Sequence, residues 1–376
     1  MKSNQYVYPS LPYKNLNNHK IFDNITGAKT VGFSHIKKII GSIRYEKVNY
    51  RGKNSAEKIF NIFLNSAIIF GPNDYISSHR NMWMEKINYF VEKKKPLQFT
   101  LLGFPFKMAV SLKTNRILPD MGELLALARL NELYKIIKKV YKPGIIINIF
   151  TEGGFGKFSG ISERDWKKYH SELVKYCRKL GWNGHIKIRA LADMEKEKNF
   201  ASVFSGNKAN FEKLYSEKDV DFLKKYDGTF GPVYRLVRSD MYSTEKLLDV
   251  YNDDISDIKL DEIARKARRE IRQRTEQCIF SYFSYLKTRD DIHYLEKVVP
   301  HYLALTVSPK PGRLGIIPIF RHVSILPYHG VTVFNNQKNK WDIKYLIDIS
   351  RDRLKKYTPV HLEKDSDPAP FYFLEK

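Results

Sequence analysis

The sequence predicts an α/β fold with a Rossmann-like, mostly parallel central sheet flanked by helices and carrying a helical insertion. In the first half of the chain, short apolar runs alternate with longer amphipathic stretches, and caps or helix breakers stand between them. Strands and helices that alternate in this way are typical of βαβ units. Residues 200–300 have a largely helical pattern and supply the insertion.

The first strand–helix unit begins with residues 98–106, QFTLLGFPF, which predict a buried strand. Residues 118–141 then predict an amphipathic helix. Its first turn holds a capping-box pattern, Asp120 with Glu123 three residues later. The Pro-Gly pair that follows the helix ends it.

Two more strands follow. Residues 145–150 predict the second strand, which runs into a glycine-rich loop. Residues 165–180 predict a helix that is closed by a glycine, and residues 185–194 predict the third strand.

Three charged residues stand where the predicted strands end, namely Lys107, Glu152 and Asp193. The carboxyl ends of parallel strands meet at one edge of a sheet, and functional residues of such folds gather there. We therefore expect these three side chains near one edge.

The chain divides into an extension and one domain. Residues 1–50 are polar and turn-rich and predict an N-terminal extension that either wraps the body or is partly disordered. Residues 51–376 contain no strong linker and predict a single elaborated α/β domain, which opens with an amphipathic helix over residues 55–70. Three further strands are predicted at residues 301–309, 314–320 and 330–334.

The composition indicates a soluble, cytoplasmic protein with an anionic small-molecule partner. The 376-residue chain has a net charge of +24, but its lysines are scattered, which favours a phosphorylated substrate over nucleic acid. The N-terminus has no apolar signal-peptide region, and no stretch approaches the ~18 apolar residues of a membrane span, so no membrane partner is expected. Two cysteines without CxxC and ten histidines without HxH or HExxH predict neither a disulfide framework nor a metal site.

The loop TEGGFGKFSG, residues 151–160, follows its strand as many phosphate-binding loops do. It fails the Walker pattern GxxxxGK[ST], because Thr151 replaces the first glycine and Phe158 follows Lys157. It also fails the dinucleotide pattern GxGxxG, because Ser159 stands where the last glycine is required. Two interpretations stay open. The glycines let the chain turn after a strand, or exposed N–H groups hold a phosphate or carboxylate with Lys157 nearby.

Three stretches share the order and spacing of a known family's motifs. They are GFPFKMAVSLKTNRILPDMGELLALARL (103–130), FTEGGFGKFSGISERDWKKY (150–169), and LALTVSP (303–309) with PYHGVTV (327–333). Together they resemble the pyoverdine/dityrosine biosynthesis family, the isocyanide (isonitrile) synthases and their fungal spore-wall relatives. The resemblance runs from about residue 55 to about residue 345.

The chain departs from the family's patterns in several places. Glu152 stands where the family has an aspartate before the glycine, and Lys157 lies near the place of a second aspartate. The family's Ser-x-His-Pro is TVSP at residues 306–309, and its Pro-Trp-His-Gly-Val is PYHGV. The loop after the second strand is therefore the best place to look for altered specificity.

The resemblance implies an isocyanide synthase. Such enzymes join the amino group of tyrosine or tryptophan to the C2 ketone of ribulose 5-phosphate, whose carbon becomes the isocyanide carbon. The family implies no metal or nicotinamide cofactor, only ribulose 5-phosphate as co-substrate, and an iron/2-oxoglutarate oxygenase as a candidate pathway partner. Imine formation, proton removal and C–C cleavage each need a general acid or base tuned near neutral pH.

Lys107, Glu152 and His329 are the catalytic candidates. Lys107 binds phosphate or carboxylate or carries a proton, or else it is an exposed loop lysine. Glu152 binds the amino group or acts as a base, or else it caps a turn. His329 shuttles protons, or it is a hydrogen-bonded turn histidine.

Six more residues are candidates for substrate binding: Asp120, Glu123, Arg129, Gly153, Lys157 and Asp193. Capping alone explains Asp120 and Glu123. Arg129 binds phosphate as a planar fork if it turns inward, and is a surface cation otherwise. Arg235 and Arg238 resemble an arginine-rich helix of the family, or they form a surface ion-pair face.

Two other functions compete with the isocyanide synthase. A family member with altered chemistry would form N-formyl-tyrosine instead of an isocyanide. A basic nucleic-acid-binding protein would need lysines clustered on one face and binding that depends strongly on salt. The product of an assay with labelled co-substrate separates these functions.

Overall fold

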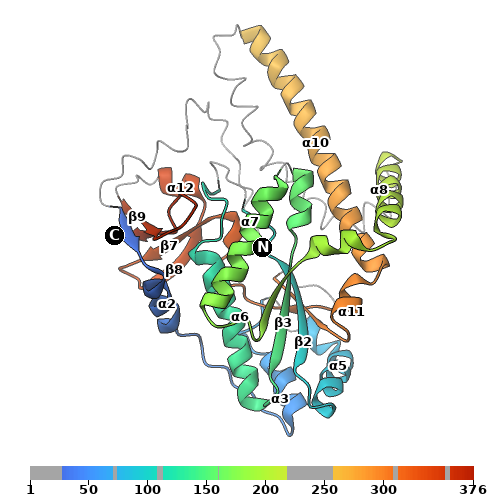
Figure 1. Cartoon of the computed structure of the whole chain (residues 1–376), viewed down its shortest axis with the longest axis vertical. Coiled ribbons are helices and arrows are strands. Elements are labelled where there is room, and N and C mark those ends of the chain that lie inside the picture. The colour runs from blue at the N-terminus through green and yellow to red at the C-terminus, as the bar shows by residue number, and fades with distance from the viewer. Residues whose placement is uncertain are drawn as a thin grey trace.

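Two five-stranded sheets and the helices around them make up the described part of the chain (Figure 1). The structure is a computed structural model that describes residues 28–70, 74–107, 113–159, 161–217, 257–307, 312–351 and 356–376. One sheet is wholly parallel and the other is mixed. The candidate site lies where the two sheets meet the start of one long helix.

The parallel sheet has the strand order β4-β3-β2-β5-β6. Its members are β2 (Leu97–Gly103), β3 (Ile145–Thr151), β4 (Ile186–Ala190), β5 (Leu303–Thr306) and β6 (Leu314–Gly315). β2 and β3 are buried along almost their whole length, which explains why their sequences are continuous apolar runs. The predicted α/β class with a parallel central sheet is confirmed.

Helices cover both sides of this sheet, as Figure 1 shows for β2 and β3. On one side lie α6 (Met121–Val140) and α7 (Glu163–Lys179), and on the other α5 (Arg80–Glu92) and α11 (Tyr294–Val298). α6 has buried residues on most of its surface, because it packs against the parallel sheet, α3 and α7. Helix α6 therefore lies at the centre of the described part of the molecule.

The second sheet is mixed and has the order β1-β9-β10-β7-β8. Its members are β1 (Lys29–Val31), β7 (Val331–Asn335), β8 (Lys340–Lys344), β9 (Tyr357–Leu362) and β10 (Tyr372–Glu375). The predicted extension 1–50 enters it, since β1 pairs with β9 and is followed by α2 (Phe33–Ser42). Residues 1–27 lie outside the described residues. The strand predicted at residues 330–334 is confirmed as β7, whereas the other four strands and their pairing into a second sheet were not predicted.

Several predicted elements are shorter than expected, among them the strands predicted over 301–309 and 314–320, which are β5 and β6. The helix predicted over 55–70 is α3 (Ser55–Ile62), and the Asn65 side chain accepts the Ala67 N–H at 2.9 Å in the turn that follows. The third strand, predicted over 185–194, ends at Ala190. The chain continues as the 3₁₀ helix η2 (Leu191–Lys196), whose buried side chains pack in a separate apolar cluster.

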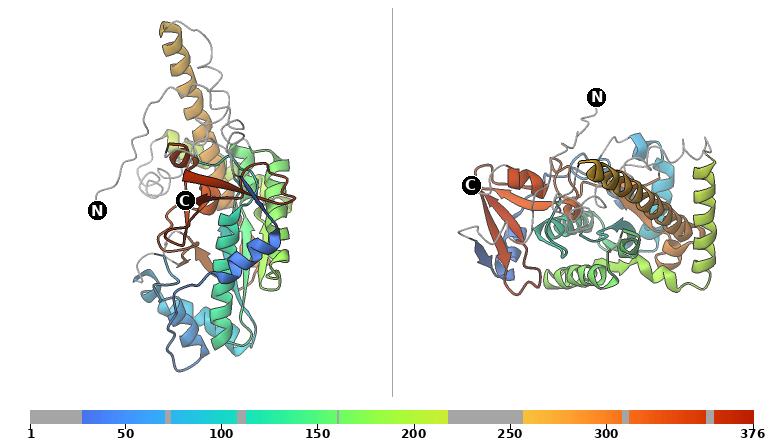
Figure 2. Two further views of the ribbon diagram at one scale, coloured as in Figure 1. Left: turned by 90° about the vertical axis from the view of Figure 1, so that its left-hand side faces the viewer. Right: turned by 90° about the horizontal axis from the view of Figure 1, so that it is seen from above.

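The helical insertion between β4 and β5 contains α8 (Phe200–Ser216) and α10 (Asp257–Asp291). The two helices pack along each other, and Figure 2 shows α10 continuing well beyond the body. Residues 218–256 lie outside the described residues. The remaining short elements are α4 (Asp74–Ser77), η1 (Gly153–Ser159), η5 (Pro327–His329) and α12 (Leu346–Arg351). Among the described helices, none is both long and apolar enough to cross a membrane.

Arg116 ties the loop before α6 to the segment between β9 and β10. Its side chain is fully buried, pairs with Asp365 and donates from Nη1 to the Ala369 backbone oxygen at 2.7 Å. Asp367 accepts the backbone N–H of Leu118 at 3.0 Å. Burial lowers the pKa of Arg116, but the charges of Asp367 and Asp365 outweigh burial and raise it. These contacts hold the start of α6 against the second sheet.

We expect Arg116→Ala to lower the free energy of unfolding by about 3–5 kcal/mol, because it leaves the Asp365 carboxylate buried without its cation. Urea unfolding of the wild type and the variant measures this loss. Lys175→Ala is the control, since it removes a partly exposed pair with Glu172 that contributes less than about 1 kcal/mol. Equal losses in the two variants would contradict a structural role for Arg116.

Candidate active site

The chain leaves the carboxyl end of β2 through a bend that carries Lys107 into the interior. Phe104 adopts a φ of 51°, a left-handed conformation that is uncommon for a residue with a side chain. Lys107 is only 1% exposed. Burial excludes the interpretation of Lys107 as an exposed loop lysine, and a buried ammonium group needs counter-charges nearby.

Two carboxylates at the start of α6 supply these counter-charges. Lys107 Nζ pairs with Asp120 and lies 3.2 Å from Glu123 Oε2. Asp120 Oδ1 accepts the Gly122 N–H at 2.7 Å, and Glu123 Oε2 accepts the Asp120 N–H at 2.9 Å. The predicted capping box is thus confirmed. The same two side chains cap the helix and neutralise Lys107, so capping is only part of what they do.

Two hydroxyl groups complete a buried cluster that consists of Lys107, Asp120, Glu123, Tyr169 and Thr332. The Tyr169 hydroxyl, from α7, donates to Glu123 Oε1 at 3.1 Å. The Thr332 hydroxyl, from β7 of the second sheet, donates to Asp120 Oδ1 at 3.0 Å. Neither residue is a candidate from the sequence, since an isolated tyrosine or threonine on an apolar face carries no functional signal.

The buried cluster sets two carboxyl groups against one ammonium group, and the pKa of Glu123 rises to about 7. Burial is the largest cause and the charge of Asp120 adds to it, whereas Lys107 lowers the pKa. Burial and Glu123 also raise the pKa of Tyr169, which keeps its hydroxyl protonated. A carboxyl group with a pKa near 7 can give and take a proton at neutral pH, as general acid–base catalysis requires.

Tyr328 in η5 connects the buried cluster with the end of β3. Burial raises the pKa of Tyr328, and the charges of Glu152 and Glu123 raise it further. Its hydroxyl therefore lies within electrostatic reach of both carboxyl groups. Glu152 follows the last residue of β3, as the sequence predicts. The structure thus brings two predicted site residues, Glu123 and Glu152, to one tyrosine that was not among the candidates.

His329 lies beside the cluster but carries no charge at neutral pH. Burial lowers its pKa, and the charges of Lys113 and Lys107 lower it further, to about 3. Its backbone N–H donates to the Leu326 oxygen at 2.9 Å in the turn of η5. A neutral imidazole can accept or donate a hydrogen bond there, but it holds no second proton to give away at pH 7.

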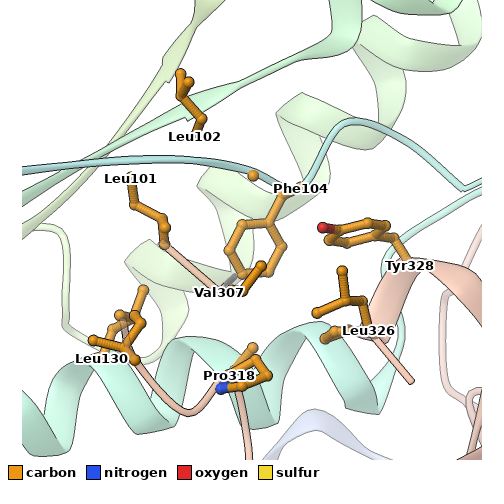
Figure 3. Close-up of a pocket in the computed structure, with 12 residues that line it drawn as sticks. Leu101, Leu102, Phe104, Leu130, Val307, Pro318, Leu326 and Tyr328 are labelled. Carbon is orange, nitrogen blue, oxygen red and sulfur yellow. The ribbon is translucent and has the colours of Figure 1, made fainter. Parts of the chain in front are cut away.

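An apolar cavity adjoins Tyr328 (Figure 3). Its wall is formed by β2, α6, η5 and the segments around β5 and β6, with Leu101, Leu130 and Leu326 among its lining residues. Phe104 and Tyr328 stand next to each other in Figure 3, with ring centroids 6.4 Å apart. The cavity is narrow, so an aromatic ligand needs side chains such as Leu326 to turn aside. Tyr328 is thus shared by the cavity and the carboxyl groups.

Arg129 is buried, but it contacts other parts of the protein. Its Nη2 donates to the Ala67 backbone oxygen, and its guanidinium lies 4.8 Å from the centre of the Tyr45 ring. The surface-cation interpretation is therefore wrong. Because α6 is buried on most sides, a residue that points inward from it need not point into the site.

Lys157 and Asp193 lie in partly exposed ion pairs. Lys157 Nζ is 2.8 Å from Glu195 Oε2, and Asp193 Oδ1 is 2.6 Å from Lys196 Nζ. The prediction that Asp193 ends the third strand is wrong, since that strand ends at Ala190 and the chain turns into η2. Among the described residues, their ion-pair partners are Glu195 and Lys196, and neither partner belongs to the buried cluster.

Gly153 is required by packing. A Cβ at this position would lie 2.5 Å from Trp166 Cε3, so the glycine allows β3 to turn closely past α7. This favours the structural interpretation of that glycine. Arg235 and Arg238 lie outside the described residues. Within the described ranges, no three His, Cys, Asp or Glu side chains are grouped as metal ligands would be.

The comparisons with known proteins agree on one family. The family model described as pyoverdine/dityrosine biosynthesis protein matches residues 87–346. L-tryptophan isonitrile synthase AmbI2 of Fischerella ambigua is 25% identical over 266 residues, which cover 68% of this chain and 73% of that protein. L-tyrosine isonitrile synthase of Pseudomonas aeruginosa is 29% identical over 142 residues, 38% of this chain and 41% of that protein.

A crystal structure shares the fold. The PvcA protein from Pseudomonas aeruginosa superposes with a TM-score of 0.64 and covers 86% of this chain and all of that chain. The two are 19% identical in sequence. The likeness extends the shared fold beyond the residues matched by the family model.

We expect the stability of the wild type relative to Glu123→Gln to fall as the pH rises. The pKa of Glu123 is raised from 4.5 to about 7, so folding favours the protonated carboxyl group. That stabilisation is fully present below pH 4.5 and is lost as the pH rises to about 7, by about 3 kcal/mol in total. Urea unfolding of both proteins across this range measures the difference. A difference that stays constant or grows would contradict the raised pKa.

Proposed function

The chain belongs to the pyoverdine/dityrosine biosynthesis protein family, and on this basis we propose that it is an isonitrile synthase. Its substrate would be an aromatic L-amino acid, tyrosine or tryptophan, and ribulose 5-phosphate would supply the isonitrile carbon. Relatives named as tryptophan and tyrosine isonitrile synthases support the reaction class. The choice between the two amino acids, and the sugar phosphate, are part of the proposal.

The observation that carries the proposal is the buried cluster with its Glu123 carboxyl group of pKa about 7. Condensing an amine with a ketone requires a base for the ammonium proton and an acid for the departing water. Removing a proton beside the resulting imine requires a base again. A single carboxyl group that is half protonated near neutral pH can both donate a proton to the substrates and take one from them.

Tyr328 would pass protons between Glu123 and the bound substrates. Its hydroxyl lies within electrostatic reach of Glu123 and Glu152, and its ring lines the apolar cavity. A tyrosine with a raised pKa stays protonated at rest and can donate its proton while it accepts one from a neighbouring carboxyl group. The completely buried Glu123 thereby gains a route to a substrate that does not touch it.

The aromatic ring and the amino group of the amino acid would bind to different parts of the site, one apolar and one charged. An aromatic ring suits the cavity beside Phe104 and Tyr328, where offset and edge-to-face ring contacts are favourable. The amino group would then face Glu152, whose carboxylate attracts an ammonium ion and can take a proton from it. Lys107 would act by holding Asp120 and Glu123 in place, because both of its close partners are carboxylates within the buried cluster.

We expect the purified protein to convert one aromatic amino acid and ribulose 5-phosphate labelled at C2 into an isonitrile that carries the label. Mass spectrometry and the infrared band of the isonitrile identify the product. A labelled N-formyl amino acid in place of the isonitrile would assign the altered chemistry. If neither product forms with any aromatic amino acid, the enzymatic proposal is refuted.

We expect Glu152→Gln and Tyr328→Phe each to lower kcat by about 100-fold or more, the usual contribution of a positioned acid or base. Both variants nearly preserve side-chain volume. Tyr89→Phe is the matched control, because Tyr89 lies on α5 with its ring against His301 and does not line the apolar cavity. Steady-state kinetics with saturating substrates measure kcat. Wild-type turnover in both variants would remove these residues from the reaction.

A further inference from the structure

Arg289, near the end of α10, has an unused hydrogen-bond donor in the interior. Its side chain is 3% exposed. Nε and Nη2 each donate to Asp290 at 2.8 Å, which uses one edge of the guanidinium. Nη1 is buried and has no hydrogen-bond partner among the described residues. A buried N–H of a charged group that stays unpaired is costly, so its position indicates a place for a polar ligand.

A second arginine lies near the same hydroxyl groups. The charges of Arg289 and Arg313 both act on the hydroxyls of Tyr282 and Tyr302, whose pKa values are raised chiefly by burial. Two cations and two protonated hydroxyls can all donate to one acceptor. Asp290 and Glu296 are the carboxylates that act on Tyr302, and Asp290 already pairs with the other edge of Arg289.

Tyr282 connects this pair of arginines with the candidate active site. It precedes Arg289 by seven residues, so the two side chains lie on one face of α10 about two turns apart. The charge of Glu152 and the hydroxyl of Tyr328 also act on Tyr282. An anion held by Arg289 and Arg313 would therefore lie on the α10 side of Tyr282, with Glu152 and Tyr328 as the next polar groups toward the cavity.

Three other cations of the described chain already have hydrogen-bond or ion-pair partners. Arg129 donates to the Ala67 oxygen, Lys157 pairs with Glu195, and Arg116 is satisfied by Asp365 and backbone oxygens. Arg289 is the buried arginine of the described chain whose guanidinium keeps an unpaired nitrogen. It is thus the best placed of these residues to accept an anion from outside.

We propose that Arg289 and Arg313, with the Tyr282 hydroxyl, form the subsite for the phosphate group of a phosphorylated sugar. That the sugar phosphate is the carbon donor rests on the proposed function, whereas recognition of the phosphate monoester does not. Asp290 already takes one edge and the charge of Arg289, so Arg289 contributes its Nη1 donor and Arg313 contributes the cation. Guanidinium groups match the oxygens of phosphate in a planar fork, and donors from two of them can reach more than one of its oxygens.

Calorimetric titration with ribulose 5-phosphate, with inorganic phosphate and with unphosphorylated ribulose tests the subsite. We expect the wild type to bind the phosphate ester more tightly, and Arg289→Lys and Arg313→Gln each to reduce this preference by about 10- to 100-fold. Affinity for the aromatic amino acid should not change. Arg164→Gln is the matched control, since Arg164 is an exposed arginine on α7 with 90% of its side chain accessible.

Three results would overturn the proposal. One is a wild type that binds neither inorganic phosphate nor the phosphate ester in preference to ribulose. The second is a preference that both variants retain. The third is a loss of amino-acid affinity in place of sugar-phosphate affinity, which would assign the site to a carboxylate. Thermal unfolding shows whether each variant is folded. If Arg289→Lys does not fold, the comparison of Arg313→Gln with the wild type is the test.

The outcome also separates this proposal from the proposed function. A wild type that forms no isonitrile but binds inorganic phosphate or the phosphate ester through Arg289 would refute the isonitrile synthase and keep the subsite. An active enzyme in which both variants leave KM for the sugar phosphate unchanged would keep the reaction and refute the subsite.

Discussion

The pairing of one buried ammonium group with two carboxylates is the constraint on which the site depends. Lys107 cannot be buried without Asp120 and Glu123, and these two side chains cannot lie there unless α6 begins at that point. Asp120 Oδ1 then accepts a further hydrogen bond from the second sheet, which the Thr332 hydroxyl donates. The loop after β2, the start of α6 and the edge of β7 are therefore positioned by one set of charges.

The same constraint gives the site its acid–base character. If a second lysine stood beside Lys107, both carboxyl groups would ionise fully and neither would exchange a proton at neutral pH. With one cation, the excess negative charge and the burial fall on Glu123. Tyr328 links this carboxyl group to the cavity, because the charge of Glu123 raises the pKa of Tyr328 and the same side chain lines the cavity. Capping, charge balance and proton transfer are three properties of the same short segment.

The sequence was informative where local patterns decide the structure. Continuous apolar runs predicted the parallel strands, and Asp120 with Glu123 predicted the start of α6, because both depend on neighbours a few residues away. Of the second sheet only β7 was predicted, since its strand β1, for example, is three residues long and pairs with a strand some 330 residues later. The partners of Arg129 and Lys157 were equally invisible, because a charge alone does not show which distant group it will meet.

The candidate site was predictable in outline and not in detail. Motifs led to Lys107 and Glu123, and the structure joins them with Tyr169 and Thr332, which stand in no recognisable pattern. Arg289 could not be singled out either, because many arginines occur in its helix and only burial with an unpaired nitrogen distinguishes it. Such properties arise from packing and are absent from any single stretch of sequence.

The late position of the second sheet in the chain affects how the protein is made. The groups that close the interior around Asp120 and Arg116 come from Thr332, Asp365 and Ala369. A ribosome that has translated only the parallel sheet has released Asp120 and Arg116 without these partners. Contacts between residues so far apart in sequence form slowly, and folding of larger chains passes through incomplete states. The nascent chain must therefore keep the Arg116 cation and one face of the Asp120 carboxylate hydrated until its final strands emerge.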